Sequence, residues 1–205
     1  MKNNLTKRKL QSLESRKKIL ETARIMIKRH GFDNITIQDI CSEAKVSKGL
    51  FYNYFSSKDQ IILAQIQEMD KYYKIIAEKE LKNYSGISKL LKLIELLFRH
   101  IKYGVGKDIT RNLYRSLIMT NKTGQMIINE HRFFFTLLTD SIKEAQDMKE
   151  LPRVLDTQKI VTQVATLTWG VLYTWCIYQR DFDVEKMAIE IISTFLDGLN
   201  AKAAL

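Results

Sequence analysis

The chain has 205 residues, of which only eight are Gly and one is Pro. An average protein has about 12 % Gly plus Pro, and turns and strand ends use most of them, so mostly helical structure is predicted. Residues 1–20 contain no apolar stretch typical of a secretory signal peptide. The two cysteines, Cys41 and Cys176, do not form a disulfide framework, so we expect a cytoplasmic protein.

The net charge of +10 is unevenly distributed along the chain. Residues 1–60 carry 13 Lys or Arg and 6 Asp or Glu, whereas residues 61–205 carry 20 and 17. A basic module joined to a nearly neutral one is typical of a protein whose basic part meets a polyanion. From the charge alone, a solvated basic surface without a partner is the alternative.

The first module is predicted to consist of short helices with identifiable ends. Apolar residues recur at helical spacing over residues 13–29, and Gly31 stops that helix. Thr36, Ser47 and Ser57 each precede a predicted helix and can cap it, because a hydroxyl oxygen accepts a hydrogen bond from the first turn. These helices cover residues 37–44, residues 48–54 and a stretch that starts near Lys58.

Longer helices are predicted for the rest of the chain. They cover residues 58–83, 87–103, 107–120, 123–147, 154–180 and 184–200. The predicted fold class is therefore all-α with about nine helices, in which a three-helix domain over residues 1–57 precedes a helical domain over residues 58–205. Because the helix at 58–83 leaves the first domain and enters the second, we expect no flexible linker.

Residues 160–178 contain no charged side chain, and this length approaches a membrane span of about 20 residues. Four Thr residues and one Gln interrupt the segment, and the helix after it has a regular apolar stripe. We therefore expect no membrane insertion, and instead a homodimer in which these two helices meet their copies in a four-helix bundle. The predicted interface residues are Val164, Leu172, Met187, Ala188, Ile191, Ile192 and Phe195.

The two short helices at 37–44 and 48–54 lie about three residues apart, which predicts a helix-turn-helix. Apolar side chains of both helices are expected to pack together; they are Ile37, Ile40, Cys41, Ala44, Val46, Leu50, Phe51 and Phe55. The other face of the second helix is polar and has no acidic side chain; it carries Ser47, Lys48, Gly49, Tyr52 and Asn53. Such a helix can enter a major groove without repelling phosphate.

These residues resemble the TetR family of bacterial transcriptional regulators over about residues 14–62. The matching elements are Thr36-Ile37, Ala44, Val46-Ser47-Lys48-Gly49, Phe51-Tyr52-Asn53-Tyr54-Phe55 and Lys58. The chain departs from the family at Lys45, where Gly is frequent in the turn. A positive φ at that position would cost Lys about 1 kcal/mol more than Gly.

The resemblance implies a role for each matching position. Residues that would grip phosphates on either side of the groove are Thr36, Tyr52, Tyr54 and Lys58. Residues that would lie nearest the base edges are Gln38, Ser47, Lys48 and Gly49. For Tyr52 and Tyr54, packing beneath the helix is the alternative role.

The resemblance also implies that the second domain is a dimerising body with a pocket for a small-molecule effector. Pocket candidates are aromatic or polar groups at apolar helical positions, namely Tyr114, His131, Phe134, Trp169, Tyr173 and Cys176. Their aromatic character predicts a largely apolar or planar effector. For each of them, a place in the core or the dimer interface is the alternative.

Catalytic chemistry is not indicated by the sequence. His30, His100 and His131 are isolated, with no metal-ligand spacing and no phosphate loop, so neither an enzyme, a metal nor a cofactor is expected. The predicted function is a regulator, a repressor released by its effector from a near-palindromic operator. The alternatives are an architectural or cell-division-type DNA-binding protein of the same fold, and a helical enzyme or membrane-associated protein whose basic module binds anionic lipid.

Overall fold

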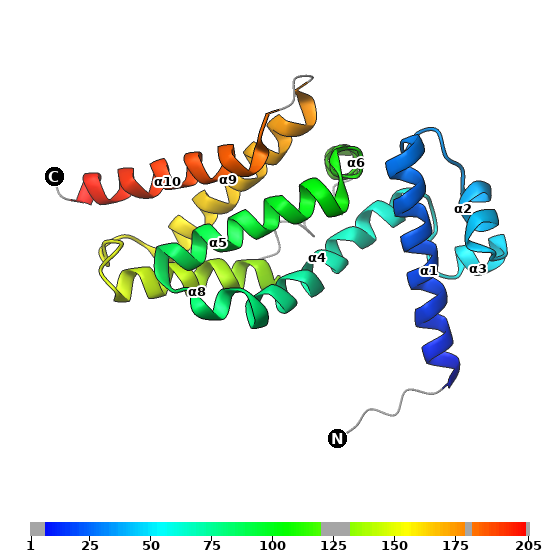
Figure 1. Cartoon of the computed structure of the whole chain (residues 1–205), viewed down its shortest axis with the longest axis horizontal. Helices are drawn as coiled ribbons and strands as arrows, with labels where there is room; N and C mark the ends of the chain where they lie inside the picture. Colours follow the sequence, from blue (N-terminus) through cyan, green and yellow to red (C-terminus); the bar gives the residue numbers. More distant parts are fainter. Residues whose placement is uncertain (1–6, 120–131, 179–181, 204–205) are drawn as a thin grey trace. The chain divides into compact units, whose positions relative to one another are not determined.

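The computed structural model describes residues 7–119, 132–178 and 182–203, and the chain divides into two compact units, Met1–Ile66 and Gln67–Leu205. The described residues contain nine α-helices and no strand, which confirms the all-α prediction (Figure 1). The helix that was expected to pass from one domain to the next is α4 (Asp59–Lys79), and the unit boundary lies within it.

The first unit contains α1 (Lys7–His30), α2 (Ile37–Ala44), α3 (Lys48–Tyr52) and the beginning of α4. Its core is formed by fully buried side chains from each helix, including Ile19, Ala23, Ile40, Phe51 and Ile61. Helix α1 begins at Lys7, earlier than the predicted start at residue 13. The apolar periodicity did not mark this start because the first turns are polar.

The second unit contains the rest of α4, a 3-10 turn η1 (Leu81–Asn83), α5 (Gly86–Arg99), a π-helix η2 (His100–Val105), α6 (Lys107–Met119), α8 (Phe133–Asp147), α9 (Thr157–Ile177) and α10 (Val184–Ala203). Helix α5 packs against α8 and α10, and α9 packs against α6, α8 and α10 (Figure 1). The single helix expected over 87–103 is thus divided between α5 and η2. Of the helix expected over 123–147, only α8 lies within the described residues.

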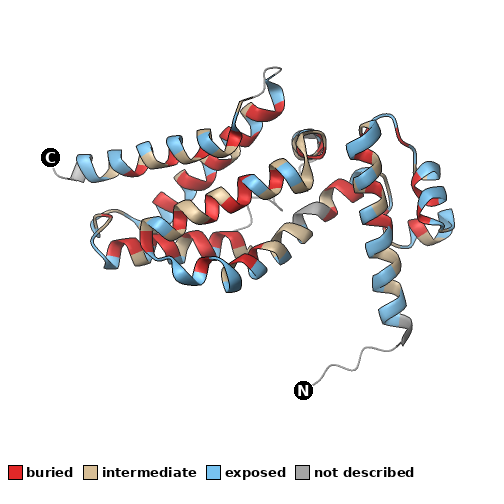
Figure 2. Ribbon diagram, in the orientation of Figure 1, coloured by how far each residue is buried: buried red, intermediate tan, exposed pale blue. Residues whose placement is uncertain are grey.

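Each helix of the second unit turns a buried stripe inward (Figure 2). Val164, Leu172, Ala188 and Ile192 belong to this stripe and are at most 6 % exposed within a single subunit. These four predicted interface residues therefore pack within the chain itself, because α9 and α10 bury them against each other and against their neighbours. Met187 and Phe195 are half-buried and Ile191 is exposed, so these three remain available to a partner.

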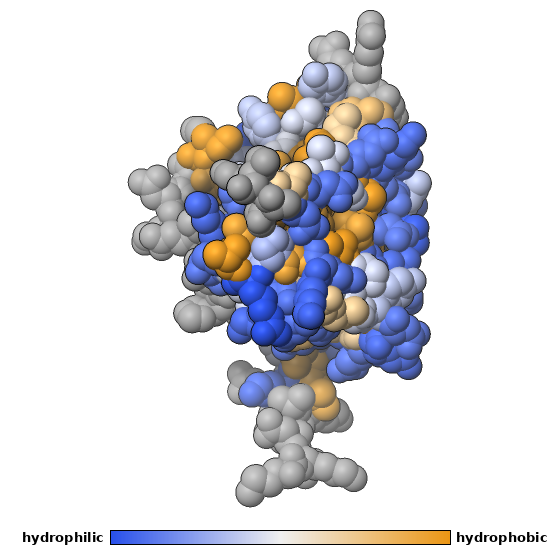
Figure 3. All heavy atoms as spheres, turned by 90° about the vertical axis from the view of Figure 1, so that its left-hand side faces the viewer, coloured by the Kyte–Doolittle hydropathy of each residue, from blue (hydrophilic) through white to orange (hydrophobic). Residues whose placement is uncertain are grey.

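Within the described residues, α9 is the one helix long and apolar enough to cross a membrane. Half of the most apolar 18-residue segment of α9 is buried inside the unit. The core helices of other proteins reach the same length and apolar composition. The face seen in Figure 3 shows hydrophobic patches separated by hydrophilic side chains.

Candidate nucleic-acid interface

Helix α2 begins with a reciprocal pair of hydrogen bonds. The backbone N–H of Asp39 donates to Thr36 Oγ1 at 3.1 Å, and the backbone N–H of Thr36 donates to Asp39 Oδ2 at 2.8 Å. The Thr36 hydroxyl also donates to Asp39 Oδ2 at 2.7 Å. These hydrogen bonds to Thr36 lower the pKa of Asp39, because they favour the carboxylate. The predicted cap is confirmed, and its hydroxyl proton is already engaged.

The turn after α2 is left-handed at Lys45, with φ 54° and ψ 48°. This geometry lets the N–H of Lys45 donate to the carbonyl of Ser42 at 3.1 Å, and the N–H of Val46 to that of Cys41 at 2.9 Å. The positive φ anticipated at this position is therefore present, in a residue whose Cβ makes it less favourable than it would be for Gly.

Helix α3 is short, and one buried side chain fixes it to the unit. The Ser47 hydroxyl accepts the N–H of Leu50 at 3.1 Å, while Phe51 is completely buried. Tyr52 is 53 % exposed, and its ring meets the Phe51 ring edge-on with centroids 5.5 Å apart. The exposed face of α3 and its two caps consists of Ser47, Lys48, Gly49, Tyr52 and Asn53. In this cap the Ser47 hydroxyl only accepts a hydrogen bond, so the O–H of Ser47 remains able to donate.

Gly49 lies on this exposed face without a local reason to be glycine. A Cβ built on it would meet only Ser47 Oγ at 3.9 Å, an ordinary contact, and the residue does not have a positive φ. Since glycine inside a helix is about 1 kcal/mol less favourable than alanine, the fold gains nothing from it. The missing side chain leaves room at the surface of α3.

Tyr54 and Lys58 make contacts inside the first unit. The Tyr54 hydroxyl donates to Ser12 Oγ at 3.1 Å. Lys58 Nζ donates to the carbonyls of Phe32 and Ile35 at 2.7 and 2.8 Å, and it lies 4.3 Å from the centre of the Phe32 ring. Packing within the domain was the alternative role for Tyr54. The role of Lys58 was missed, since no local pattern pairs a lysine with carbonyls more than 20 residues away.

Gln38 lies exposed on α2, and its side-chain amide donates to Ser42 Oγ at 3.3 Å. This bond joins two residues one turn apart on the same helix. Gln38 and the exposed face of α3 belong to consecutive helices that pack against each other.

The structure brings together three of the six pocket candidates in the second unit. The hydroxyl of Tyr114 on α6 donates to the carbonyl of Trp169 at 2.8 Å, and its ring meets Tyr173 edge-on at 5.8 Å. Burial raises the pKa of Tyr114, so the hydroxyl stays protonated and keeps this bond. Trp169 in turn meets the ring of Phe135 at 6.0 Å.

The other three candidates are placed differently. Phe134 is buried and stacks on Tyr73 of α4 at 5.2 Å. Cys176 is buried as well, and burial raises the pKa of its thiol to about 11, which keeps it protonated and unreactive. His131 lies outside the described residues. No group of His, Cys, Asp and Glu able to hold a metal ion occurs among the described residues.

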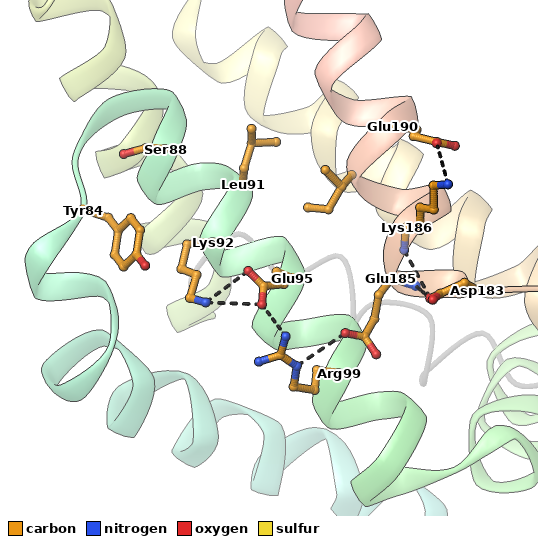
Figure 4. A pocket seen from close by; sticks show the side chains of 11 residues that line it. Tyr84, Ser88, Leu91, Lys92, Glu95, Arg99, Asp183, Glu185, Lys186 and Glu190 are labelled. Atoms are coloured by element: carbon orange, nitrogen blue, oxygen red, sulfur yellow. Dashed lines mark hydrogen bonds and ion pairs between the residues drawn. The ribbon is translucent and has the colours of Figure 1, made fainter.

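A surface groove of about 650 Å³ runs between α5 and α10 (Figure 4). Its charged side chains pair with one another: Arg99 Nε lies 3.4 Å from Glu185, and Lys92 lies 3.1 Å from Glu95. Arg99 also pairs with Glu95. The charged side chains of Lys92, Glu95, Arg99 and Glu185 are thus paired with one another along the groove.

Two sequence models of known families match the chain. The model of bacterial regulatory proteins of the tetR family matches residues 19–64, which include the helix-turn-helix. The model of the C-terminal region of MAATS-type transcriptional repressors matches residues 117–201.

Similar proteins are regulators as well. The chain is 22 % identical to the HTH-type transcriptional regulator UidR of Escherichia coli K12 over 91 % of this chain and 90 % of UidR. It is 33 % identical to the regulator YuxN of Bacillus subtilis over 43 % of this chain, a match that covers only 31 % of YuxN. The fold resembles that of the regulator FadR from Bacillus subtilis, solved with stearoyl-CoA, with a TM-score of 0.72 and 17 % identity over 89 % of this chain and 98 % of that one.

Proposed function

Because the chain belongs to the TetR family of DNA-binding transcriptional regulators, we propose that it is a cytoplasmic homodimeric repressor that a small molecule releases from its operator. The observation that carries this proposal is the exposed face of α3, which offers hydroxyl, ammonium and backbone groups and no carboxylate. The match to the C-terminal region of transcriptional repressors supports the sign of regulation.

Base reading is assigned to the outer face of α3 and to the neighbouring residue of α2. Lys48 can donate to guanine O6 and N7, and Gln38 can pair with adenine if its amide turns away from Ser42. The Ser47 O–H adds a donor, and Gly49 lets the backbone and a thymine methyl approach closely. The space around Gly49 supports this role, since the subunit itself does not need a glycine there.

Phosphate contact is assigned first to Tyr52, whose exposed hydroxyl lies beside the base-reading residues. Phosphate oxygens only accept hydrogen bonds, so a contacting group must have a proton to donate. Thr36 and Tyr54 direct their hydroxyl protons to Asp39 and Ser12, and Lys58 uses two of its N–H groups on carbonyls. We therefore assign to these three residues the positioning of α2 and α3, with phosphate contact left to Tyr52 and to the third N–H of Lys58.

Dimerisation is assigned to the outer sides of α9 and α10. From Thr162 to the end of α9, the exposed residues lie along one side and carry no charge; they are Thr162, Thr166, Gly170, Tyr173 and Ile177. On α10, Met187, Ile191 and Gly198 lie along one side as well. A Cβ on Gly170 or Gly198 would have no atom within 4 Å inside the subunit, so both positions leave room for a second backbone. Tyr173, a pocket candidate from the sequence, fits this surface better because it is 46 % exposed.

Effector binding is assigned to the aromatic region of the second unit around Tyr114 and Trp169, which the Phe135 ring connects to Phe134. FadR was solved with stearoyl-CoA, whose acyl chain is apolar, and this supports an effector with an apolar part in a fold of this kind. To release DNA, the effector must prefer one of two dimer conformations by a few kcal/mol.

The experiment that tests the regulator proposal is a selection of bound sequences from a random DNA library at about 150 mM salt, where non-specific phosphate contacts are weak. An enriched near-palindrome, with half-sites one helical turn or more apart, is the expected result. Binding that fades smoothly with salt and enriches no sequence would overturn the proposal and favour an architectural DNA-binding role.

A further inference from the structure

The first three turns of α1 extend beyond the buried core of the first unit. Ile19 is the first buried side chain of α1, and the side chains described for residues 9–18 are all exposed or half-buried. Residues 7–18 include six Lys or Arg and one Glu. This stretch is therefore a helical extension with a strong positive charge and little apolar contact.

The local sequence does not favour this extension as an isolated helix. Its first turn holds Lys7, Arg8 and Lys9 and no acidic residue, which opposes the positive end of the helix dipole. Like charges three or four residues apart also repel one another. A local sequence that disfavours the structure it adopts indicates that these residues serve a function other than folding. A bound polyanion would relieve both the unfavourable interaction with the helix dipole and the repulsion between like charges.

One face of the extension is fixed against the end of the helix-turn-helix. Ser12 Oγ accepts the hydrogen bond of Tyr54, and the Arg16 guanidinium carbon lies 5.5 Å from the centre of the Phe55 ring. Lys9, Ser12 and Arg16 follow at three- and four-residue spacing, so they lie on the same side of α1. We call these three residues the α1 basic face. Tyr54 and Phe55 follow α3 directly, so these contacts fix the α1 basic face to the end of the helix-turn-helix.

We infer that the α1 basic face is a second DNA contact, which binds backbone phosphates outside the bases that α3 reads. This inference rests on the proposed function and names a further part of the same interface. Its charge matches a phosphate backbone, and phosphate contacts add affinity without sequence preference. The hydrogen bond from Tyr54 to Ser12 is assigned the role of holding this face in register with α3.

The test compares Lys9→Gln with Lys18→Gln on the operator obtained by selection. Both residues are exposed lysines of α1, and their separation of nine residues places them on opposite sides of the helix. For Lys9→Gln, we expect the slope of log affinity against log salt to fall by about 0.9 per subunit. At about 150 mM salt this corresponds to roughly fivefold weaker binding per subunit, with unchanged base preference. Lys18→Gln is expected to leave the slope at the wild-type value.

A second arm varies the length of the DNA. On a duplex that ends at the outer edges of the two half-sites, the flanking phosphates are missing, and wild type and Lys9→Gln should bind equally. On a duplex extended by about one helical turn at each end, wild type should regain its advantage.

Equal effects of Lys9→Gln and Lys18→Gln, or a Lys9→Gln variant that matches wild type on the long duplex, would overturn the inference. Thermal unfolding of both variants checks that α1 still folds. If wild type itself enriches no sequence, the proposed function fails; if it enriches a palindrome but Lys9→Gln changes nothing, only this inference fails.

Discussion

Two surfaces remain open on a single subunit, and their chemistry differs. The outer face of α3 carries hydroxyl groups and an ammonium group. The outer side of α9 carries no charge at its five exposed positions from Thr162 to Ile177. A polar face without carboxylates matches a phosphate backbone, and an uncharged face with an unneeded glycine matches another helix. Both surfaces lie on helices whose opposite side is buried in the core. The core therefore holds each helix in place, while the exposed residues make few contacts within the subunit. The chemistry of these exposed residues therefore indicates the kind of partner, DNA for α3 and a second subunit for α9.

The largest effect is expected from charge on the uncharged surface. Ile191 is 37 % exposed, and Ile191→Glu would bury an unpaired carboxylate at the proposed dimer interface. Such a charge costs about 3–5 kcal/mol, enough to dissociate the dimer at micromolar concentration. Sedimentation measures the outcome. Ser193→Glu is the matched control, because Ser193 lies on the other side of α10 with Lys186 and Glu190. An intact Ile191→Glu dimer would contradict the assignment of this surface.

The next effect concerns the support beneath the DNA-reading helices. Lys58→Met keeps the aliphatic stem but removes the hydrogen bonds to the carbonyls of Phe32 and Ile35. We expect the first unit to lose about 2–3 kcal/mol of stability, measured by chemical denaturation. If Lys58 acts on phosphate alone, stability will stay unchanged and only the salt slope of DNA binding will fall.

A smaller effect is expected for base reading. Lys48→Ala should lower the preference for the selected operator over variants with a changed guanine by about 1–3 kcal/mol. Competition binding with single-base variants of the operator measures this preference. A loss of affinity that is the same for every sequence would assign Lys48 to the phosphates instead.

Tyr52→Phe is expected to lower the affinity for DNA without changing the base preference. It removes one hydroxyl and leaves the ring contact with Phe51 in place. Affinity should fall about tenfold per subunit on all sequences, since one hydrogen bond to a charged group is lost. Equal losses for Tyr52→Phe and Lys48→Ala on every DNA would remove the distinction between the two roles.

The smallest effect is a gain of stability in the turn of the helix-turn-helix. Lys45 has a φ of 54°, so Lys45→Gly should stabilise the first unit by about 1 kcal/mol. Thermal or chemical unfolding measures it. Lys18→Gly, in the interior of α1, is the matched control and should destabilise by a similar amount. A destabilised Lys45→Gly variant would show that the lysine side chain has a role of its own there.

Local interactions explain why the helix-turn-helix could be predicted closely. The predicted second helix, residues 37–44, agrees with α2, because Thr36, Asp39 and the turn at Lys45 determine both of its ends through contacts within a few residues. The caps by Thr36 and Ser47 and the end of α1 at Gly31 are confirmed for the same reason. The start of α1 was missed because its first turns carry no apolar pattern.

The second unit was predicted less well because its helices depend on contacts distant in sequence. The apolar stripe of α10 was visible, but the sequence could not tell which neighbour covers each part of it. Ala188 and Ile192 face the chain's own core, while Ile191 between them remains exposed. The same uncertainty affected the aromatic residues, since Tyr173 and Phe134 look alike in sequence and differ completely in burial.

The sequence by itself determined the helical class, the helix-turn-helix and the polar face of α3, because caps, turns and amphipathic spacing act over a few residues. Only the tertiary structure decided what those residues hold in place. Lys58 reaches carbonyls more than 20 residues away, and Tyr54 reaches Ser12 across the unit. Such partners are set by how helices pack, and packing depends on all of the side chains that fill the core between them.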